Sequence, residues 1–217
     1  MVESNTVTIK AGERVAKFRM KGVYENIGKT DSLSVTFNLL AKDENIWDLY
    51  GTRTRVQMQK ACPFELSTFE GYCLLTSSFF SAYMTNTEHR LLQAERDKAE
   101  DNTIILHDFF YKNYDLKIKY DPSDPLKPFV EFDEQIIGST AEAFGTIYGN
   151  GKLMCDQPVA YDSYYNVCQK FVILYTTIYV VGKGTVGTYV NILEWISDEE
   201  AEQYKKEAVS YTHLRAH

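Results

Sequence analysis

Basic side chains recur at alternate positions along two short stretches near the N-terminus. Lys17, Arg19 and Lys21 alternate with apolar residues, and Arg53 and Arg55 repeat this spacing further along the chain. Alternate residues of an extended strand share one face, so neighbouring cations of the first set would stand about 6–7 Å apart. That separation is close to the spacing of phosphates along an extended single strand. The pattern indicates a surface for a polyanion.

Aromatic residues in the same segment would complete such a surface. Trp47 and Tyr50 could provide rings on which bases stack, and small β-barrels hold single-stranded nucleic acid by combining cations with such rings. An ordinary solvated strand face is the competing interpretation, and no family motif is matched. The expected nucleic-acid-binding residues are Lys17, Arg19, Lys21, Arg53, Arg55, Trp47 and Tyr50.

A glycine-rich motif, GKGTVG, follows the longest apolar stretch of the chain. Gly182, Gly184 and Gly187 match the G-x-G-x-x-G pattern of a dinucleotide-binding turn. The alternative is a β-hairpin that joins strands over residues 171–181 and 188–196, because both stretches are rich in β-branched and aromatic residues. We favour the hairpin, since bulky residues follow Gly187 where a cofactor-binding helix would begin. Both faces of 171–181 are apolar, which predicts a central strand covered on both sides.

The other reactive residue types match no catalytic or metal-binding spacing. His89 is expected to face solvent on a polar helix, and His107, beside Asp108, to be a structural histidine in a strand. The acidic residues between positions 115 and 134 are expected to form a solvated face. We therefore expect no catalytic residue, metal or cofactor. Four cysteines lack any C-x-x-C spacing and are expected to be buried free thiols in a reducing compartment: Cys62, Cys73, Cys155 and Cys168.

Alternating apolar and polar residues predict a β-dominated fold. Residues 14–24 and 32–40 are expected to form an antiparallel pair, with a third strand over 52–60. Further strands are expected at 103–110, 114–120 and 129–137. Ser67 with Glu70, and Ser197 with Glu200, have the spacing of helix-capping boxes. The expected fold class is α+β, with antiparallel strands and hairpins in a small barrel or sandwich-like sheet and one or two packed helices around 67–100.

Length and charge limit the organisation of the chain. The 217 residues carry 23 Lys and Arg against 30 Asp and Glu, a net charge of −7, yet residues 1–60 hold ten basic and seven acidic residues. We expect one domain over 1–208, with a weak subdomain boundary in the proline-rich stretch 121–128. The last nine residues, VSYTHLRAH, match a translated transposase adapter of short-read sequencing libraries, so 209–217 are not expected to be native. That origin suggests a gene from a shotgun assembly, where phage genes are common.

The resulting functional hypothesis is a non-enzymatic protein that binds single-stranded nucleic acid through its N-terminal sheet. One alternative is a phage virion structural or assembly protein whose Tyr-rich surfaces bind copies of itself in a homo-oligomer. A further alternative is a nucleotide-dependent enzyme that uses Gly182–Gly187. The polar N-terminus and the short apolar stretches predict no membrane interaction and a cytoplasmic location, in the host cell if the gene is phage-encoded.

Overall fold

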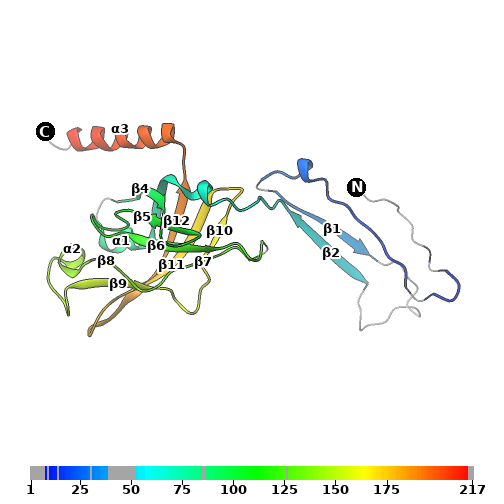
Figure 1. Cartoon of the computed structure of the whole chain (residues 1–217), viewed down its shortest axis with the longest axis horizontal. Coiled ribbons are helices and arrows are strands. Elements are labelled where there is room, and N and C mark those ends of the chain that lie inside the picture. Colours follow the sequence, from blue (N-terminus) through cyan, green and yellow to red (C-terminus); the bar gives the residue numbers. More distant parts are fainter. Residues whose placement is uncertain are drawn as a thin grey trace. The chain divides into compact units, whose positions relative to one another are not determined.

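The structure is a computed structural model that describes residues 8, 10–13, 15–29, 31–38, 52–84, 87–125 and 127–214, with side chains described up to residue 206. The chain divides into two compact units, residues 1–62 and residues 63–217. Both are built from antiparallel strands (Figure 1). The expected fold class, β-dominated α+β with antiparallel hairpins, is therefore confirmed.

The N-terminal unit contains a two-stranded ribbon of β1 (Ser32–Asn38) and β2 (Arg53–Gln59), preceded by the 3-10 turn η1 (Tyr24–Asn26). Val35 lies opposite Val56, and Phe37 lies opposite Thr54, so one side of the ribbon is largely apolar. The preceding extended segment covers this side: the ring of Phe18 lies 5.0 Å from that of Phe37 in an edge-on arrangement.

The predicted pairing of residues 14–24 with 32–40 is wrong. Within the described residues 15–23, the only ladder contact is an isolated bridge at Met20, and β1 pairs instead with the stretch predicted as a third strand. Ala16, Phe18 and Met20 do alternate with polar residues, but the segment that carries them packs across the apolar side of the ribbon and does not pair with β1. A covering segment and a paired strand need the same two-residue period, so the pattern could not distinguish them.

The second unit is an up-and-down barrel of eight strands in which each strand is hydrogen-bonded to the next along the ring. Its closure depends on β10, which pairs with β7 through Tyr164 and Phe129 and with β11 through residues 164–166. Full closure leaves the ring without free edges. The barrel strands are β3 (Gly71–Ser77), β4 (His89–Arg96), β5 (Thr103–Leu106), β6 (Leu116–Asp121), β7 (Phe129–Glu131), β10 (Tyr164–Asn166), β11 (Phe171–Val180) and β12 (Gly184–Trp195).

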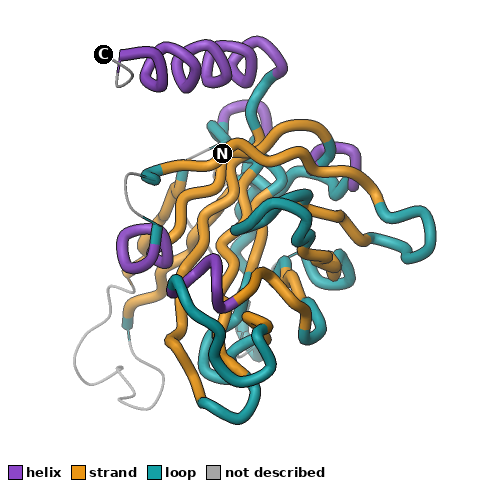
Figure 2. Tube along the Cα trace, turned by 90° about the vertical axis from the view of Figure 1, so that its left-hand side faces the viewer, coloured by secondary structure: helices purple, strands orange, loops and turns teal. Residues whose placement is uncertain are grey.

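A second hairpin branches from the barrel between β7 and β10. Its strands are β8 (Gln135–Ser139) and β9 (Lys152–Asp156), joined through α2 (Thr140–Phe144), and β9 pairs with the far half of β11 at residues 177–179. Ser139 and Glu142 form a reciprocal capping box at the start of α2. One long strand, β11, thus pairs with β10 over its first half and with β9 over its second. The strands curve around a common interior in Figure 2.

Aromatic side chains fill the barrel interior. The rings of Phe69 and Tyr120 lie 4.6 Å apart and those of Phe79 and Phe110 lie 4.8 Å apart, and all four side chains are almost wholly buried. Asn191, a buried polar residue of the interior, is hydrogen-bonded: it accepts from the Ser77 hydroxyl at 2.6 Å and donates to the Leu174 carbonyl at 2.9 Å. The interior is therefore a packed core.

The helices expected between residues 67 and 100 are mostly wrong. Residues Leu66–Phe69 form a 3-10 turn, η3, that ends before Gly71, whose φ of +96° suits glycine. The stretch then continues as β3, the short helix α1 (Ser78–Tyr83) and β4. Three consecutive residues of β3 are buried, and Cys73 and Leu75 among them belong to the interior cluster. The aromatic residues of this stretch lie on several elements that contribute rings to one interior.

The predicted hairpin of the apolar stretch is confirmed, because β11 and β12 pair as antiparallel neighbours. Its connection is shorter than expected: β12 begins at Gly184, and the register shifts between Ile178 and Tyr179, so Gly187 lies within the strand. The expectation that β11 is covered on both faces is wrong. Its inward residues are buried, but its outward residues, such as Tyr175, are only half-buried on the outside of the barrel.

Helix α3 (Asp198–Leu214) follows the end of β12 (Figure 1). The predicted cap is present, because the Glu200 N–H donates to the Ser197 hydroxyl at 3.3 Å and the Glu200 carboxylate accepts the Ser197 N–H at 2.8 Å. Ala201 is fully buried. The helix continues through residues 209–214, for which the adapter origin stays a prediction. No helix in the described ranges is both long enough and apolar enough to cross a membrane.

Candidate functional site

The N-terminal basic residues do not gather on one face. Phe18 packs on the apolar side of the ribbon, so its neighbours Lys17 and Arg19 point away from the ribbon on that side, where both are exposed. Arg53 and Arg55 flank Thr54, which shares a face with Phe37, and therefore project from the opposite side of the ribbon. Lys21 is exposed and follows the alternation of Lys17 and Arg19.

The structure thus divides the sequence-predicted site into two cationic faces. Arg55 lies opposite Thr36, so this second face is the polar side of the ribbon. Trp47 and Tyr50, predicted to stack on bases, lie outside the described residues.

A cavity of about 470 Å³ lies in the second unit, lined by residues of β3, β4, the turn after β5 and α3. Leu74 and Leu91, opposite each other on the outer face of the barrel, provide apolar lining. Tyr72, His89 and Lys205 provide polar groups. Cavities of this size with apolar walls and a few converging polar groups are typical small-molecule sites.

Lys205 holds helix α3 against the barrel at this cavity. Its ammonium lies 4.2 Å from the ring centroid of Tyr72, donates to the Tyr72 hydroxyl at 3.0 Å and pairs with Glu202 at 2.7 Å. The bond to Glu202, followed by the bond to Tyr72, raises the pKa of Lys205. The Lys205 side chain therefore stays protonated at neutral pH, paired with the Glu202 carboxylate.

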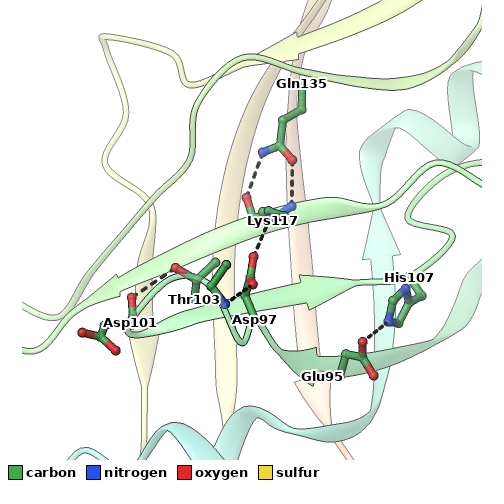
Figure 3. Close-up of polar contacts among 8 residues, drawn as sticks. Glu95, Asp97, Asp101, Thr103, His107, Lys117 and Gln135 are labelled. Atoms are coloured by element: carbon green, nitrogen blue, oxygen red, sulfur yellow. Dashed lines mark hydrogen bonds and ion pairs between the residues drawn. The ribbon is translucent and has the colours of Figure 1, made fainter.

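His107 lies at the cavity wall between two carboxylates. Its Nδ1 is 3.0 Å from Asp115 Oδ2, and its Nε2 is 3.3 Å from Glu95 Oε1 (the latter pair is drawn in Figure 3). The other oxygen of Asp115 accepts the backbone N–H of Asp108, which has a left-handed φ of +54°. Each ring nitrogen lies beside a carboxylate, which positions His107 as part of the cavity wall.

Sequence reasoning singled out both histidines but placed neither at a site. His89 was expected on a polar helix, whereas it begins β4 and its Nδ1 lies 2.8 Å from the Thr76 hydroxyl on β3. His107 is satisfied by partners, as expected, but it also lines the cavity. The pairing of β3 with β4 and of β4 with β5 brings these side chains together, and no spacing in the sequence signals it.

The cysteines differ from the expectation of four free thiols. Cys73 and Cys155 are free and buried, and burial raises the pKa of both thiols, that of Cys155 to about 12. Cys62 and Cys168 are each disulfide-bonded, so the expectation is wrong for these two. In the described part of the chain, no cluster of three or more His, Cys, Asp or Glu side chains could hold a metal ion.

Comparison with known proteins gives one match. The model of a family described as a domain of unknown function (DUF4984) matches residues 49–207, which include all eight barrel strands and the cavity. No curated protein and no solved structure matches the chain.

Proposed function

Because the chain belongs to the DUF4984 family, whose function is unknown, we propose its function from the structure: residues 63–217 form a non-enzymatic binding module for a small ligand. The observation that carries the proposal is the cavity beneath α3, with Leu74 and Leu91 on its apolar wall and Lys205 among its polar groups. Aromatic side chains fill the barrel interior, so we place the ligand in the cavity on the outer face of the barrel.

A fragment screen tests the proposal. Leu91→Trp should fill the cavity, whereas Ile136→Trp, at an exposed position of β8 remote from the cavity lining, serves as the size-matched control. Fragments that shift the backbone amide signals of Tyr72 and His89 in heteronuclear NMR spectra should bind the wild type and Ile136→Trp, but not Leu91→Trp. If no fragment shifts these signals in the wild type at millimolar concentration, the module has a different function.

We further propose that the protein works in an oxidising compartment, which replaces the expectation of a cytoplasmic location. Disulfides persist in such compartments and are rare in the reducing cytosol, and Cys62 and Cys168 are disulfide-bonded. Thiol labelling of the unfolded protein without reductant should modify Cys73 and Cys155 alone. Labelling of all four cysteines in protein purified from its own cell without reductant would restore the cytoplasmic hypothesis.

Single-stranded nucleic-acid binding is the second candidate function. Lys17 and Arg19 stand exposed on the outward side of the segment that covers the ribbon, which supports the proposal for the N-terminal unit. Because the five basic residues lie on two faces, a single nucleic-acid strand contacts either the set on the covering segment or the set on the ribbon. An oxidising location would argue against this function, so binding of an oligonucleotide at low salt must be measured directly.

Assembly of the protein with copies of itself is supported by exposed rings outside the barrel. Tyr161 stacks on Tyr175 at 5.1 Å, and Tyr164 and Phe129 are each more than a third exposed on paired strands. Aromatic residues are enriched in protein interfaces. Sedimentation equilibrium at increasing protein concentration tests this, since a constant monomer mass would exclude self-assembly.

A further inference from the structure

The charged side chains in the cavity lining are two basic residues and one carboxylate. They are Lys205, Arg90 and Asp108, and the two lining histidines add polar ring nitrogens. That carboxylate accepts the backbone N–H of Asn113 and so serves the turn between β5 and β6. The balance of charge disfavours a cationic ligand.

The acidic residues near the cavity already have basic partners. Glu95 and Asp115 pair with His107 from outside the lining, and Glu202 pairs with Lys205. Arg90 donates to the carbonyl of Phe110 at 2.8 Å, so its guanidinium contributes charge without being aimed at the cavity. The group best placed to meet a ligand is therefore the Lys205 ammonium.

Lys205 has the geometry to bind an anion at the cavity. Two of its three N–H donors are used by Tyr72 and Glu202 among the described residues, which leaves one donor for a ligand. The ammonium lies over the Tyr72 ring, which covers one side of it, and a charge-assisted hydrogen bond from it to an anion is stronger than a hydrogen bond between neutral groups.

We propose that the cavity binds an organic carboxylate whose planar apolar body lies against Leu74 and Leu91 and whose anionic group bonds to Lys205. The inference rests on the proposed function and specifies the class of its ligand. A volume of about 470 Å³ accommodates one or two fused rings with a carboxylate. His89, whose Nδ1 is engaged by Thr76, lies in the same lining and adds a polar contact.

Equilibrium dialysis with 2-naphthoate and its neutral amide, 2-naphthamide, tests the inference on the full chain. The two probes share shape and apolar area and differ in charge. Wild type should prefer the naphthoate by about tenfold, the value of one charge-assisted hydrogen bond. Lys205→Met and Lys205→Gln should bring the ratio of the two dissociation constants near one, while Lys205→Arg keeps the preference. Lys206→Met, on the exposed side of α3, is the matched control.

The outcomes separate the two proposals. If wild type binds both probes equally, or if Lys205→Gln keeps the tenfold preference, the carboxylate inference is wrong while the binding module stands. If neither probe binds wild type and no fragment shifts the cavity signals, the proposed function fails. If Lys205→Met binds neither probe because α3 has lost its contact with Tyr72, the ratio in Lys205→Gln decides, since glutamine keeps an uncharged hydrogen-bond donor on the side chain.

Discussion

The side-chain amide of Gln135 makes the two backbone hydrogen bonds with Lys117 that a neighbouring strand would otherwise make. Its Nε2 donates to the Lys117 carbonyl and its Oε1 accepts the Lys117 N–H, both at 2.9 Å (Figure 3). The ladder between β6 and β7 covers only residues 119–121 of β6. The backbone of Lys117 therefore faces a gap in the barrel wall, and Gln135 closes it from β8.

Substitution of Gln135 should weaken this part of the barrel. Gln135→Ala removes both hydrogen bonds, and Gln135→Glu keeps the acceptor but places a carboxylate against the Lys117 carbonyl. We expect the free energy of unfolding to fall by about 1 kcal/mol per lost bond, and the Lys117 amide to exchange faster with solvent in Gln135→Ala. Urea denaturation and NMR hydrogen exchange measure the two effects. Gln169→Ala, at an exposed turn, is the control, and unchanged exchange at Lys117 would refute the role of Gln135.

Two neighbouring tyrosines of the core should respond in opposite directions to loss of their hydroxyls. The rings of Tyr120 and Tyr165 lie 5.1 Å apart. Tyr165 donates to the Asp121 carbonyl at 3.3 Å, whereas the hydroxyl of Tyr120 has no partner within the described part of the chain. Burial raises the pKa of Tyr120 well above its usual range. An unpaired buried hydroxyl destabilises the folded state.

We therefore expect Tyr120→Phe to raise the free energy of unfolding by about 1–3 kcal/mol and Tyr165→Phe to lower it by about 1 kcal/mol. Urea titrations of the two variants and the wild type provide the comparison. Destabilisation by Tyr120→Phe would mean that a buried water satisfies the hydroxyl, and the prediction would then be wrong.

Secondary structure was predicted more reliably from the sequence where a residue pattern is compatible with a single local structure. The run from Phe171 is too rich in β-branched residues for a helix, and Ser197 with Glu200 satisfies backbone groups at a helix start; both predictions held. The pattern around Ser67 failed because Phe69 of η3 and Phe79 and Phe80 of α1 are buried in one barrel core, and the strand pairings that close the barrel, such as that of β10 with β11, do not show in the sequence.

The cavity could not be predicted in the same way. Tyr72 and Lys205 are 133 residues apart and meet only because α3 folds back over β3. His89 and His107 come together through strand register. The disulfide-bonded state of Cys62 and of Cys168 could not be predicted either, since the sequence gives the number of cysteines and not which of them form disulfides.

Stability in acid should depend on Asp97, which is buried just after the end of β4. The carboxylate bonds to the Lys117 ammonium and accepts the Ala99 N–H at 2.8 Å, and these bonds, that to Lys117 first, lower the pKa of Asp97. A group whose pKa is lower in the folded state stabilises it above the unfolded pKa, about 4. That stabilisation is lost as the pH falls through the lower folded pKa.

Asp97→Asn should therefore have a lower melting temperature than wild type above about pH 5, and the difference should shrink as the pH falls below about 4. Melting curves by circular dichroism from about pH 5 down to about pH 2 provide the measurement. Asp133→Asn, at an exposed carboxylate, is the control. A difference that stays constant over this whole range would contradict the assigned bonds.

The N-terminal cations allow a test of nucleic-acid binding in which each face serves as the other's control. Three cations on the covering segment would neutralise three phosphates of a single strand, giving a log–log salt slope of about −2. Charge reversal at Lys17, Arg19 and Lys21 should reduce affinity for a labelled oligonucleotide by about tenfold or more, as measured by fluorescence anisotropy at low salt. Reversal at Arg53 and Arg55, on the opposite side of the ribbon, should leave affinity nearly unchanged.

Neither set of substitutions should move the melting temperature much, because exposed charges contribute little to stability. Equal losses from both sets would mean that the strand wraps around the ribbon or that binding is non-specific. Loss only with Arg53 and Arg55 would transfer the site to the polar side of the ribbon, next to Thr36 and Asn38. No binding at tens of micromolar protein would remove the nucleic-acid hypothesis and leave the cavity beneath α3 as the functional site of the chain.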